Sequence, residues 1–254
     1  MDITGDATVM EAIQPSVEKF LGELPGEVNG QTGTDFYNET HPWVVAAKPR
    51  MKALAEAGDE GFVVPTQVSY VGKAGAIYDE GEVVPGSATV VARFLRTGYL
   101  WDHVRVMGGA YGGFCVFSPF SGLISFLSYR DPNLEKTIDV YDEAADALLE
   151  AAEAMESDPD ILETAIIGTI GDMDGAMSPQ QKGGTAFQRW LVNESPEYRQ
   201  KFRDEVLNTK PSDFKDFANR LKQMKNPSVA VVSSKGAFET AAKAGKVMNL
   251  QEVL

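Results

Sequence analysis

The glycine-dense segment at residues 105–113 constrains this chain more than any other feature. It reads Arg-Val-Met-Gly-Gly-Ala-Tyr-Gly-Gly and places four glycines within six positions. Glycine loses more conformational freedom on folding than any other residue, so such a cluster needs a structural reason. That reason is either a backbone with positive φ or the close approach of another backbone. We therefore expect a tight turn here, flanked by the side chains of Arg105 and Tyr111.

Two interpretations of Arg105 and Tyr111 are open from the residues alone. In the first, the fixed fork of arginine donors holds peptide carbonyls or a carboxylate. The tyrosine hydroxyl then donates a hydrogen bond to the oxygen of a tetrahedral intermediate. In the second, Arg105 is a surface side chain paired with an acid, and Tyr111 packs beside the turn.

The acidic composition limits the classes of partner. The formal net charge of −14 argues against nucleic-acid binding, which needs a basic surface. The charge either serves solubility alone or attracts cationic partners. No apolar run of about eighteen residues is present, so no membrane span is expected. The acidic N-terminus also lacks the apolar region of a secretory signal, and we expect a soluble protein.

The residues that commonly bind metals are too few for a zinc site. Neither His41 nor His103 has a histidine or carboxylate four positions on, and Cys115 is the only cysteine. We expect Cys115, in Gly-Gly-Phe-Cys-Val-Phe, to be a buried, unreactive thiol. Asp172 and Asp174 resemble a calcium loop but lack its closing glutamate, so we interpret them as a helix-ending turn. No motif for a serine nucleophile or for phosphate binding is present.

The first sixty residues read as an appendage to the main domain. Residues 2–5 are expected to form a short strand, followed by an amphipathic helix capped by Asp6 and ended by Pro25. Residues 25–60 read as an interdomain linker with a short helix at 50–57. A single helix and strand cannot bury their own apolar face, so residues 1–24 must dock on something else, for which a domain absent from this sequence is one candidate.

The rest of the chain predicts one α+β domain over residues 61–254. We expect a largely antiparallel sheet covered by helices, of the split β-α-β kind. The strands are expected at 62–70, 113–119, 122–130 and 228–233, and the helices at 87–96, after 131–132, and at 161–170, 179–192, 196–207, 212–224 and 236–245. In the helix after Pro132 we expect a buried stripe of Leu134, Ile138, Tyr141, Ala145 and Leu148.

Several long segments resemble one protein family. They are Phe62-Val-Val-Pro-Thr-Gln-Val-Ser-Tyr-Val-Gly-Lys-Ala, the stretch from Leu100 to Cys115, the stretch from Phe126 to Leu134, and Ala165-Ile-Ile-Gly-Thr-Ile-Gly-Asp. These segments resemble the C-terminal domain of presequence proteases, which belong to the pitrilysin/insulinase zinc metallopeptidases with an inverted H-x-x-E-H motif. The similarity runs from about Phe62 to the end, and residues 1–24 resemble the closing strand and helix of the preceding domain.

The resemblance implies a pitrilysin-like fold and a divided active site. Four related α+β domains would form two halves around a closed chamber, with the zinc and a glutamate base in the N-terminal half. Arg105 and Tyr111 match the arginine and tyrosine that reach the peptide from the C-terminal half. Arg105 would anchor a carbonyl just past the scissile bond, and Tyr111 would stabilise the oxyanion. Gly108, Gly109 and Ala110, which lie between them, are assigned to substrate binding.

The resemblance also implies partners and a location. The partners would be unfolded peptides, such as basic targeting presequences, and the zinc-bearing N-terminal half. The compartment would be the mitochondrial matrix or plastid stroma, or the cytoplasm in a bacterium. The chain lacks the zinc ligands and the base, so we expect it to be part of a metalloendopeptidase and inactive alone. A non-catalytic interaction or scaffold domain of the same fold is the alternative, and a stand-alone small-ligand binder has no motif in its favour.

Overall fold

A computed structural model of the chain describes residues 3–25, 42–43, 45–47, 49, 58–79 and 81–253. The described residues fall into two compact units, one built from residues 1–48 and 174–201 and the other from residues 49–173 and 202–254. In chain order the elements are α1 (Ala7–Glu23), β1 (Glu60–Val63), β2 (Tyr70–Ala76), α4 (Ser87–Phe94), η1 (Leu95–Tyr99), η2 (Trp101–Met107), β3 (Gly112–Phe117), β4 (Leu123–Tyr129), α5 (Glu135–Ser157), α6 (Pro159–Met173), α7 (Pro179–Leu191), α8 (Pro196–Leu207), α9 (Pro211–Lys222), β5 (Lys225–Ser233), α10 (Lys235–Lys243) and β6 (Asn249–Glu252).

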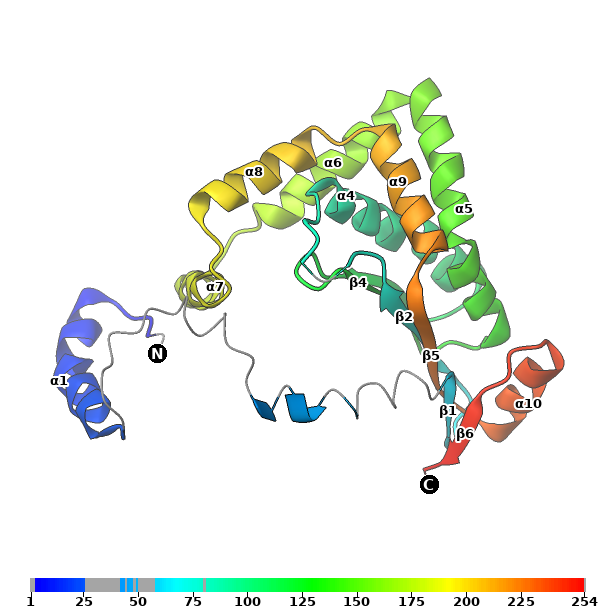
Figure 1. Cartoon of the computed structure of the whole chain (residues 1–254), viewed down its shortest axis with the longest axis horizontal. Helices are drawn as coiled ribbons and strands as arrows, with labels where there is room; N and C mark the ends of the chain where they lie inside the picture. Colours follow the sequence, from blue (N-terminus) through cyan, green and yellow to red (C-terminus); the bar gives the residue numbers. More distant parts are fainter. Residues whose placement is uncertain are drawn as a thin grey trace. The chain divides into compact units, whose positions relative to one another are not determined.

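The second unit is built on a six-stranded mixed sheet. The strand order is β3-β4-β2-β5-β1-β6. The neighbours from β3 to β5 pair antiparallel, whereas β1 pairs parallel with β5 on one side and with β6 on the other. Figure 1 shows α4, α5 and α9 on one face of this sheet. The expected α+β class and the hairpin of β3 and β4 are therefore confirmed.

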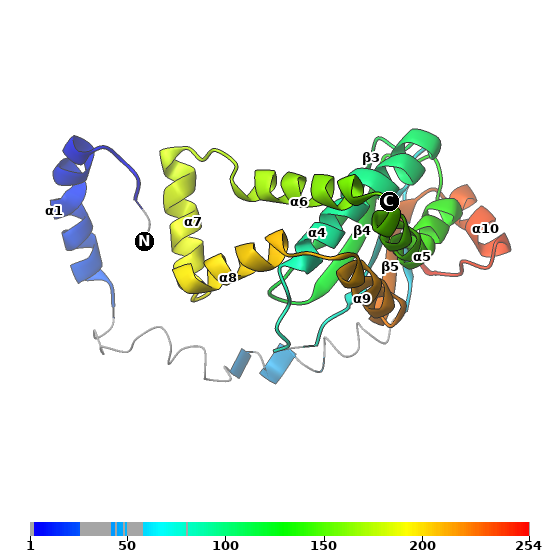
Figure 2. The same ribbon diagram turned by 90° about the horizontal axis from the view of Figure 1, so that it is seen from above.

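The core lies between the sheet and this helical layer. Apolar residues at helical spacing turn inward along α5 and at Leu134, the residue before it. All members of the expected stripe are buried: Leu134, Ile138, Tyr141, Ala145 and Leu148. The aromatic ring of Tyr141 stacks on Phe126 of β4, with the ring centroids 5.4 Å apart. Seen from above, α6 runs beside α4, and α9 runs beside α5 (Figure 2).

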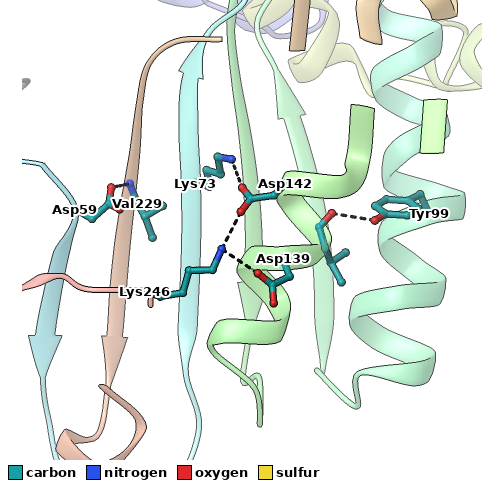
Figure 3. A network of polar contacts seen from close by, with 8 residues as sticks. Asp59, Lys73, Tyr99, Asp139, Asp142, Val229 and Lys246 are labelled. Atoms are coloured by element: carbon teal, nitrogen blue, oxygen red, sulfur yellow. Dashed lines mark hydrogen bonds and ion pairs between the residues drawn. The ribbon is translucent and has the colours of Figure 1, made fainter. Parts of the chain in front are cut away.

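An ion-pair network fixes α5 to the sheet and to the chain after α10. Asp142 of α5 binds Lys73 of β2, and its second oxygen accepts a hydrogen bond from Lys246 Nζ at 2.9 Å (Figure 3). Lys246 also lies 2.9 Å from a carboxylate oxygen of Asp139. Burial opposes the charged form of Asp142, but the hydrogen bonds from both lysines prevail and lower its pKa.

The opposite face of the sheet carries exposed apolar side chains. The register pairs Phe114 with Leu127, and Gly112 with Tyr129, so the outward positions of β3 and β4 share one face. Gly72 of β2 pairs with Leu127, which places Tyr70 on that face as well. We call this surface the open sheet face; its exposed side chains are Tyr70, Phe114, Val116, Leu123, Leu127 and Tyr129.

Two strands expected near the N-terminus differ from the structure. Residues 3–5 are not a strand, although α1 follows and Asp6 caps it by accepting a hydrogen bond from Val9 N at 2.9 Å. The strand expected at 62–70 is instead the end of β1 and the first residue of β2. Pro65 lacks an N–H for sheet pairing, and the Thr66 hydroxyl bonds the backbone of Val68 to form a turn.

Two further expectations need correction, and one strand was not expected. The helix after Pro132 begins only at Glu135, because the Asp131 carboxylate accepts a hydrogen bond from Asn133 N at 2.9 Å and holds a turn. β6 was not expected, since its exposed residues show no apolar alternation. The helix expected to end at residue 96 continues to Met107. Most of the expected linker at 25–60 lies outside the described residues, so that interpretation stays a prediction.

Candidate functional site

The glycine-rich turn follows a helix whose second half is widened. After α4, the segments η1 and η2 have π-helical geometry, with backbone bonds that span five residues rather than four. The buried side chains of Leu95 and Leu100 are therefore five positions apart, and the buried Val104 follows four positions later. Arg105 follows Val104 directly and lies at the edge of the buried face.

The turn itself contains both structural reasons expected for its glycines. Gly109 has φ of +79°, a conformation that a side chain disfavours. A Cβ atom on Gly113 would lie 3.0 Å from Leu100 O and 3.0 Å from Val104 Cβ, because β3 passes close to η2. The turn is closed by hydrogen bonds from Gly109 N to Arg105 O at 3.0 Å and from Ala110 N to Val104 O at 3.1 Å.

Backbone hydrogen bonds join the turn to the end of β4. The Tyr111 N–H is shared between Tyr129 O at 3.1 Å and Arg130 O at 3.3 Å. The Asn133 side chain donates to Gly108 O at 2.6 Å. Asp131, which is fully buried, stabilises this region through hydrogen bonds. Its carboxylate accepts a hydrogen bond from Thr137 Oγ1 at 2.7 Å in addition to the one from Asn133.

Arg105 and Tyr111 line the same surface pocket of about 470 Å³. The Arg105 guanidinium lies over the Trp101 ring, 4.8 Å from its centroid, and 5.4 Å from the centroid of Tyr111. Tyr111 is 64% exposed, so most of its surface is accessible. Gly109 and Ala110 also line the pocket, whereas Gly108 does not and binds Asn133 instead.

Arg130 also lines this pocket and was not expected there from the sequence. It follows β4 with φ of +49°, which is unusual for a residue with a side chain. Its guanidinium lies 5.7 Å from the centroid of the Tyr129 ring. Two local features of the sequence could have marked Arg130 as a candidate: it directly follows an aromatic strand residue, and an Asp-Pro break comes after it. Only the pairing of β3 with β4 brings it beside Tyr111.

Of the other candidate residues, His103, Asp172 and Cys115 do not line this pocket. Across residues 3–25, 42–43, 45–47, 49, 58–79 and 81–253, no group of three or more metal-binding side chains is arranged to hold an ion. The described residues therefore do not fit a zinc site. The His103 ring lies 4.5 Å from that of Tyr99, and Asp172 accepts hydrogen bonds from Arg93 and Arg96. Asp174 belongs to the other unit, and His41 lies outside the described residues.

Cys115 lies on the helix-covered side of β3 and is buried, as expected. Burial raises the pKa of its thiol to about 12, which disfavours the reactive thiolate.

Among the helices that the structure describes, none is long and apolar enough to cross a membrane.

Comparisons with known proteins point to one family. The family model of the PreP C-terminal domain matches residues 59–235. Presequence protease 1, chloroplastic/mitochondrial, of Arabidopsis thaliana is 42% identical over 231 residues, which cover 91% of this chain and 20% of that protein. Protein HypA of Clostridium perfringens is 34% identical over 218 residues, covering 85% of this chain and 21% of its own length. The chain thus spans about a fifth of these relatives.

Solved structures share the fold. Pitrilysin superposes with a TM-score of 0.53 at 13% identity, covering 77% of this chain and 22% of that one. The peptidase M16 inactive domain from Pseudomonas fluorescens gives a TM-score of 0.52 at 15% identity, covering 70% of this chain and 43% of the other. At these identities the likeness concerns the fold alone, which is pitrilysin-like.

Proposed function

Because the chain belongs to the PreP C-terminal domain family, we propose that it is the substrate-binding C-terminal domain of a zinc metalloendopeptidase that degrades unfolded peptides. Arg105 and Tyr111 contact the bound peptide, and the zinc and its general base belong to another part of the full-length enzyme. The observation that carries this proposal is the shared pocket of Arg105 and Tyr111.

The surroundings of the pocket suit an extended peptide. Tyr129 is a member of the open sheet face, and its ring centroid lies 5.8 Å from that of Tyr111. The pocket therefore continues into exposed apolar side chains that lie on neighbouring strands. Unfolded peptides expose their apolar side chains, so such a surface next to hydrogen-bond donors favours them over folded proteins.

Arg105 positions a substrate carbonyl. Its guanidinium lies over two aromatic rings, those of Trp101 and Tyr111, and it has no acidic partner in the described part of the chain. Stacking restricts the side chain without using its N–H groups, so these donors are available to the peptide. Arg105 thereby holds the carbonyl just past the scissile bond.

Tyr111 stabilises the oxyanion. Its phenolic hydroxyl donates a hydrogen bond to the carbonyl oxygen, and this bond strengthens as negative charge develops there. The backbone N–H of Tyr111 is held by the end of β4, which fixes the start of the side chain before the substrate arrives. In the full-length enzyme the bound zinc supplies the activated water. Gly109 and Ala110 leave room for the peptide backbone beside these donors.

The proposed substrates are basic peptides such as targeting presequences. The net charge of −14 attracts cationic chains over long distances and raises their encounter rate. The curated relatives include proteins named as mitochondrial or chloroplastic presequence proteases. We propose the mitochondrial matrix or the plastid stroma as the compartment of this protein, and the cytoplasm if its source is bacterial.

The test combines this chain with a zinc-bearing N-terminal half and measures cleavage of a basic peptide. Tyr111→Phe should lower kcat/KM by about 100-fold, the usual effect of removing one oxyanion donor. Arg105→Gln should lower kcat/KM by about 10- to 100-fold, because it removes a charge-assisted hydrogen bond to a substrate carbonyl. Tyr129→Phe is the matched control, because it deletes a hydroxyl from the neighbouring ring. Arg96→Gln is the control for the arginine, since Arg96 pairs with Asp172 instead of lining the pocket.

Two results would contradict the proposal. If Tyr111→Phe and Arg105→Gln change kcat/KM no more than their controls do, the two residues are not catalytic. If the combined halves bind peptide but do not cleave it, while the zinc-bearing half is intact, the chain is a non-catalytic interaction domain.

A further inference from the structure

We propose that Arg130 is a second substrate-binding residue, which together with Arg105 binds a carboxylate of the peptide. The carboxylate is either an acidic side chain or the C-terminal group of the substrate. This inference rests on the proposed peptide-binding function of the pocket and adds a preference that the proposed function does not contain.

The pocket concentrates positive charge in a chain that is strongly acidic. Arg105 and Arg130 both line it, and none of its lining residues is an aspartate or glutamate. Neither arginine pairs with an acid within the residues that the structure describes. With a net charge of −14, acidic side chains are abundant elsewhere on the protein. Two unpaired guanidinium groups in one pocket therefore favour an anion supplied by the ligand.

A second arginine of this protein also lies over an aromatic ring but, unlike Arg130, is paired with an acid. Arg220 lies over the ring of Tyr78, 4.1 Å from its centroid, and its Nη2 binds Glu82 at 2.7 Å. Its charge is thus satisfied inside the fold. The Arg130 guanidinium lies farther from its ring, 5.7 Å from the centroid of Tyr129, and has no such carboxylate among the described residues. The acid that completes the arrangement at Arg220 is missing at Arg130.

The aromatic rings place the two arginines on one continuous support. Arg105 lies over Tyr111, and Arg130 lies over Tyr129. The two tyrosine rings meet edge to face at an interplanar angle of 71°. Each ring restricts the guanidinium above it while leaving its N–H edge available. Such preorganised forks match the planar, bidentate geometry of a carboxylate, which a lysine ammonium does not.

The backbone at Arg130 is strained and is held in place by its neighbours. A residue with a Cβ atom at φ of +49° costs about 1 kcal/mol relative to ordinary regions. The next residue, Asp131, exchanges two backbone hydrogen bonds with Ser69, at 2.7 and 2.9 Å. The carbonyl of Arg130 also accepts a hydrogen bond from Tyr111 N. A glycine would relieve the strain, so the presence of arginine here points to a use for its side chain.

The inference separates two roles of charge in substrate binding. The acidic protein as a whole attracts basic peptides, but the pocket disfavours a lysine or arginine side chain placed directly in it. A bound peptide should therefore position a carboxylate at Arg105 and Arg130 and leave its basic residues outside.

The experiment measures binding of four labelled peptides to the 254-residue chain by fluorescence anisotropy at low salt. The peptides share one sequence and carry either glutamate or glutamine at one position, with either a free or an amidated C-terminus. The wild type should bind the best carboxylate peptide about fivefold more tightly than the peptide with neither group. Comparison of the two singly charged peptides identifies which carboxylate is bound.

Variants assign the preference to Arg130. Arg130→Gln should remove the fivefold preference, Arg130→Lys should retain only part of it, and Arg96→Gln should leave it unchanged. Arg130→Gly removes the guanidinium and the strain together. It should lose the preference while unfolding no earlier than the wild type, which separates the loss from misfolding.

The outcomes distinguish this inference from the proposed function. If all four peptides bind equally, or if Arg130→Gln keeps the preference, the carboxylate site is refuted while peptide binding stands. If Arg105→Gln weakens every peptide and Arg130→Gln weakens only the carboxylate peptides, both proposals are supported. If no peptide binds to the wild-type chain, the carboxylate site is refuted, and the cleavage assay with the combined halves decides the proposed function separately.

Discussion

Substitution of Gly113 by alanine tests the close approach of β3 to η2. The added Cβ atom would lie 3.0 Å from Leu100 O, 3.0 Å from Val104 Cβ and 3.2 Å from Val104 Cγ1. Leu100 and Val104 are both buried, so the methyl group has no open space to enter. Such overpacking costs about 1–3 kcal/mol. Alanine also restricts the unfolded chain, which offsets this by about 0.5 kcal/mol.

The expected net loss for Gly113→Ala is therefore about 1–2 kcal/mol in the free energy of unfolding. Gly98 of η1 offers a matched control, because a Cβ atom there would meet nothing within 4 Å. Gly98→Ala should be neutral or stabilise the protein by about 0.5–1 kcal/mol, since alanine suits a helix interior better than glycine. Urea unfolding followed by circular dichroism measures both variants.

The same substitution should also weaken peptide binding. If β3 moves away from η2, Tyr111, which directly precedes β3, moves relative to Arg105, and the pocket that they line changes shape. Gly98→Ala should leave the anisotropy titration unchanged. A Gly113→Ala variant with wild-type urea midpoint and wild-type peptide affinity would refute the packing argument.

Three further perturbations follow from the contacts. Asp142→Asn should lower stability at pH 7 by about 1 kcal/mol, since Asp142 is partly exposed. Hydrogen bonds from both lysines lower the pKa of Asp142 despite burial, so its contribution is present above the ordinary value of 3.8 and is lost as the pH falls below it. The gap between wild type and variant in urea midpoint should therefore narrow from pH 5 to pH 3; a constant gap would contradict this. Cys115 should not react with a thiol reagent at pH 8 until urea is added, because burial raises its pKa to about 12; fast labelling of the native protein would show an accessible thiol. Asn133→Ala should cost about 1 kcal/mol by leaving Gly108 O without its donor, and should weaken peptide binding if the turn loosens; unchanged urea midpoint and affinity would show that this bond is dispensable.

The regular elements of the fold could be predicted where periodicity and burial agree. The stripe from Leu134 to Leu148 was readable because its spacing matches the α-helix. The helix beyond residue 96 was not, because π-helical geometry places the buried Leu95 and Leu100 five positions apart. β2 contains two glycines and Lys73, so its sequence lacks the apolar alternation typical of a strand. The mostly buried Lys73 side chain fits there only because it pairs with Asp142 of α5, which the local sequence does not show.

The candidate site could be predicted only where its residues are close in sequence. Arg105 and Tyr111 stand on either side of one turn, and the glycines between them mark it. Arg130 comes from a different strand and reaches the pocket through the pairing of Gly112 with Tyr129. No local pattern encodes that pairing, because it depends on the register of β3 and β4.

The strand order also determines when each strand can pair with its neighbours during synthesis. Of the six strands, β1 is the first to leave the ribosome, yet both of its neighbours, β5 and β6, come from residues 225–252. The hairpin of β3 and β4 can form early from local contacts, whereas β1 keeps two unpaired edges until nearly the whole domain has been translated. The last strands therefore complete the fold, and premature termination before β5 would leave an edge open to aggregation.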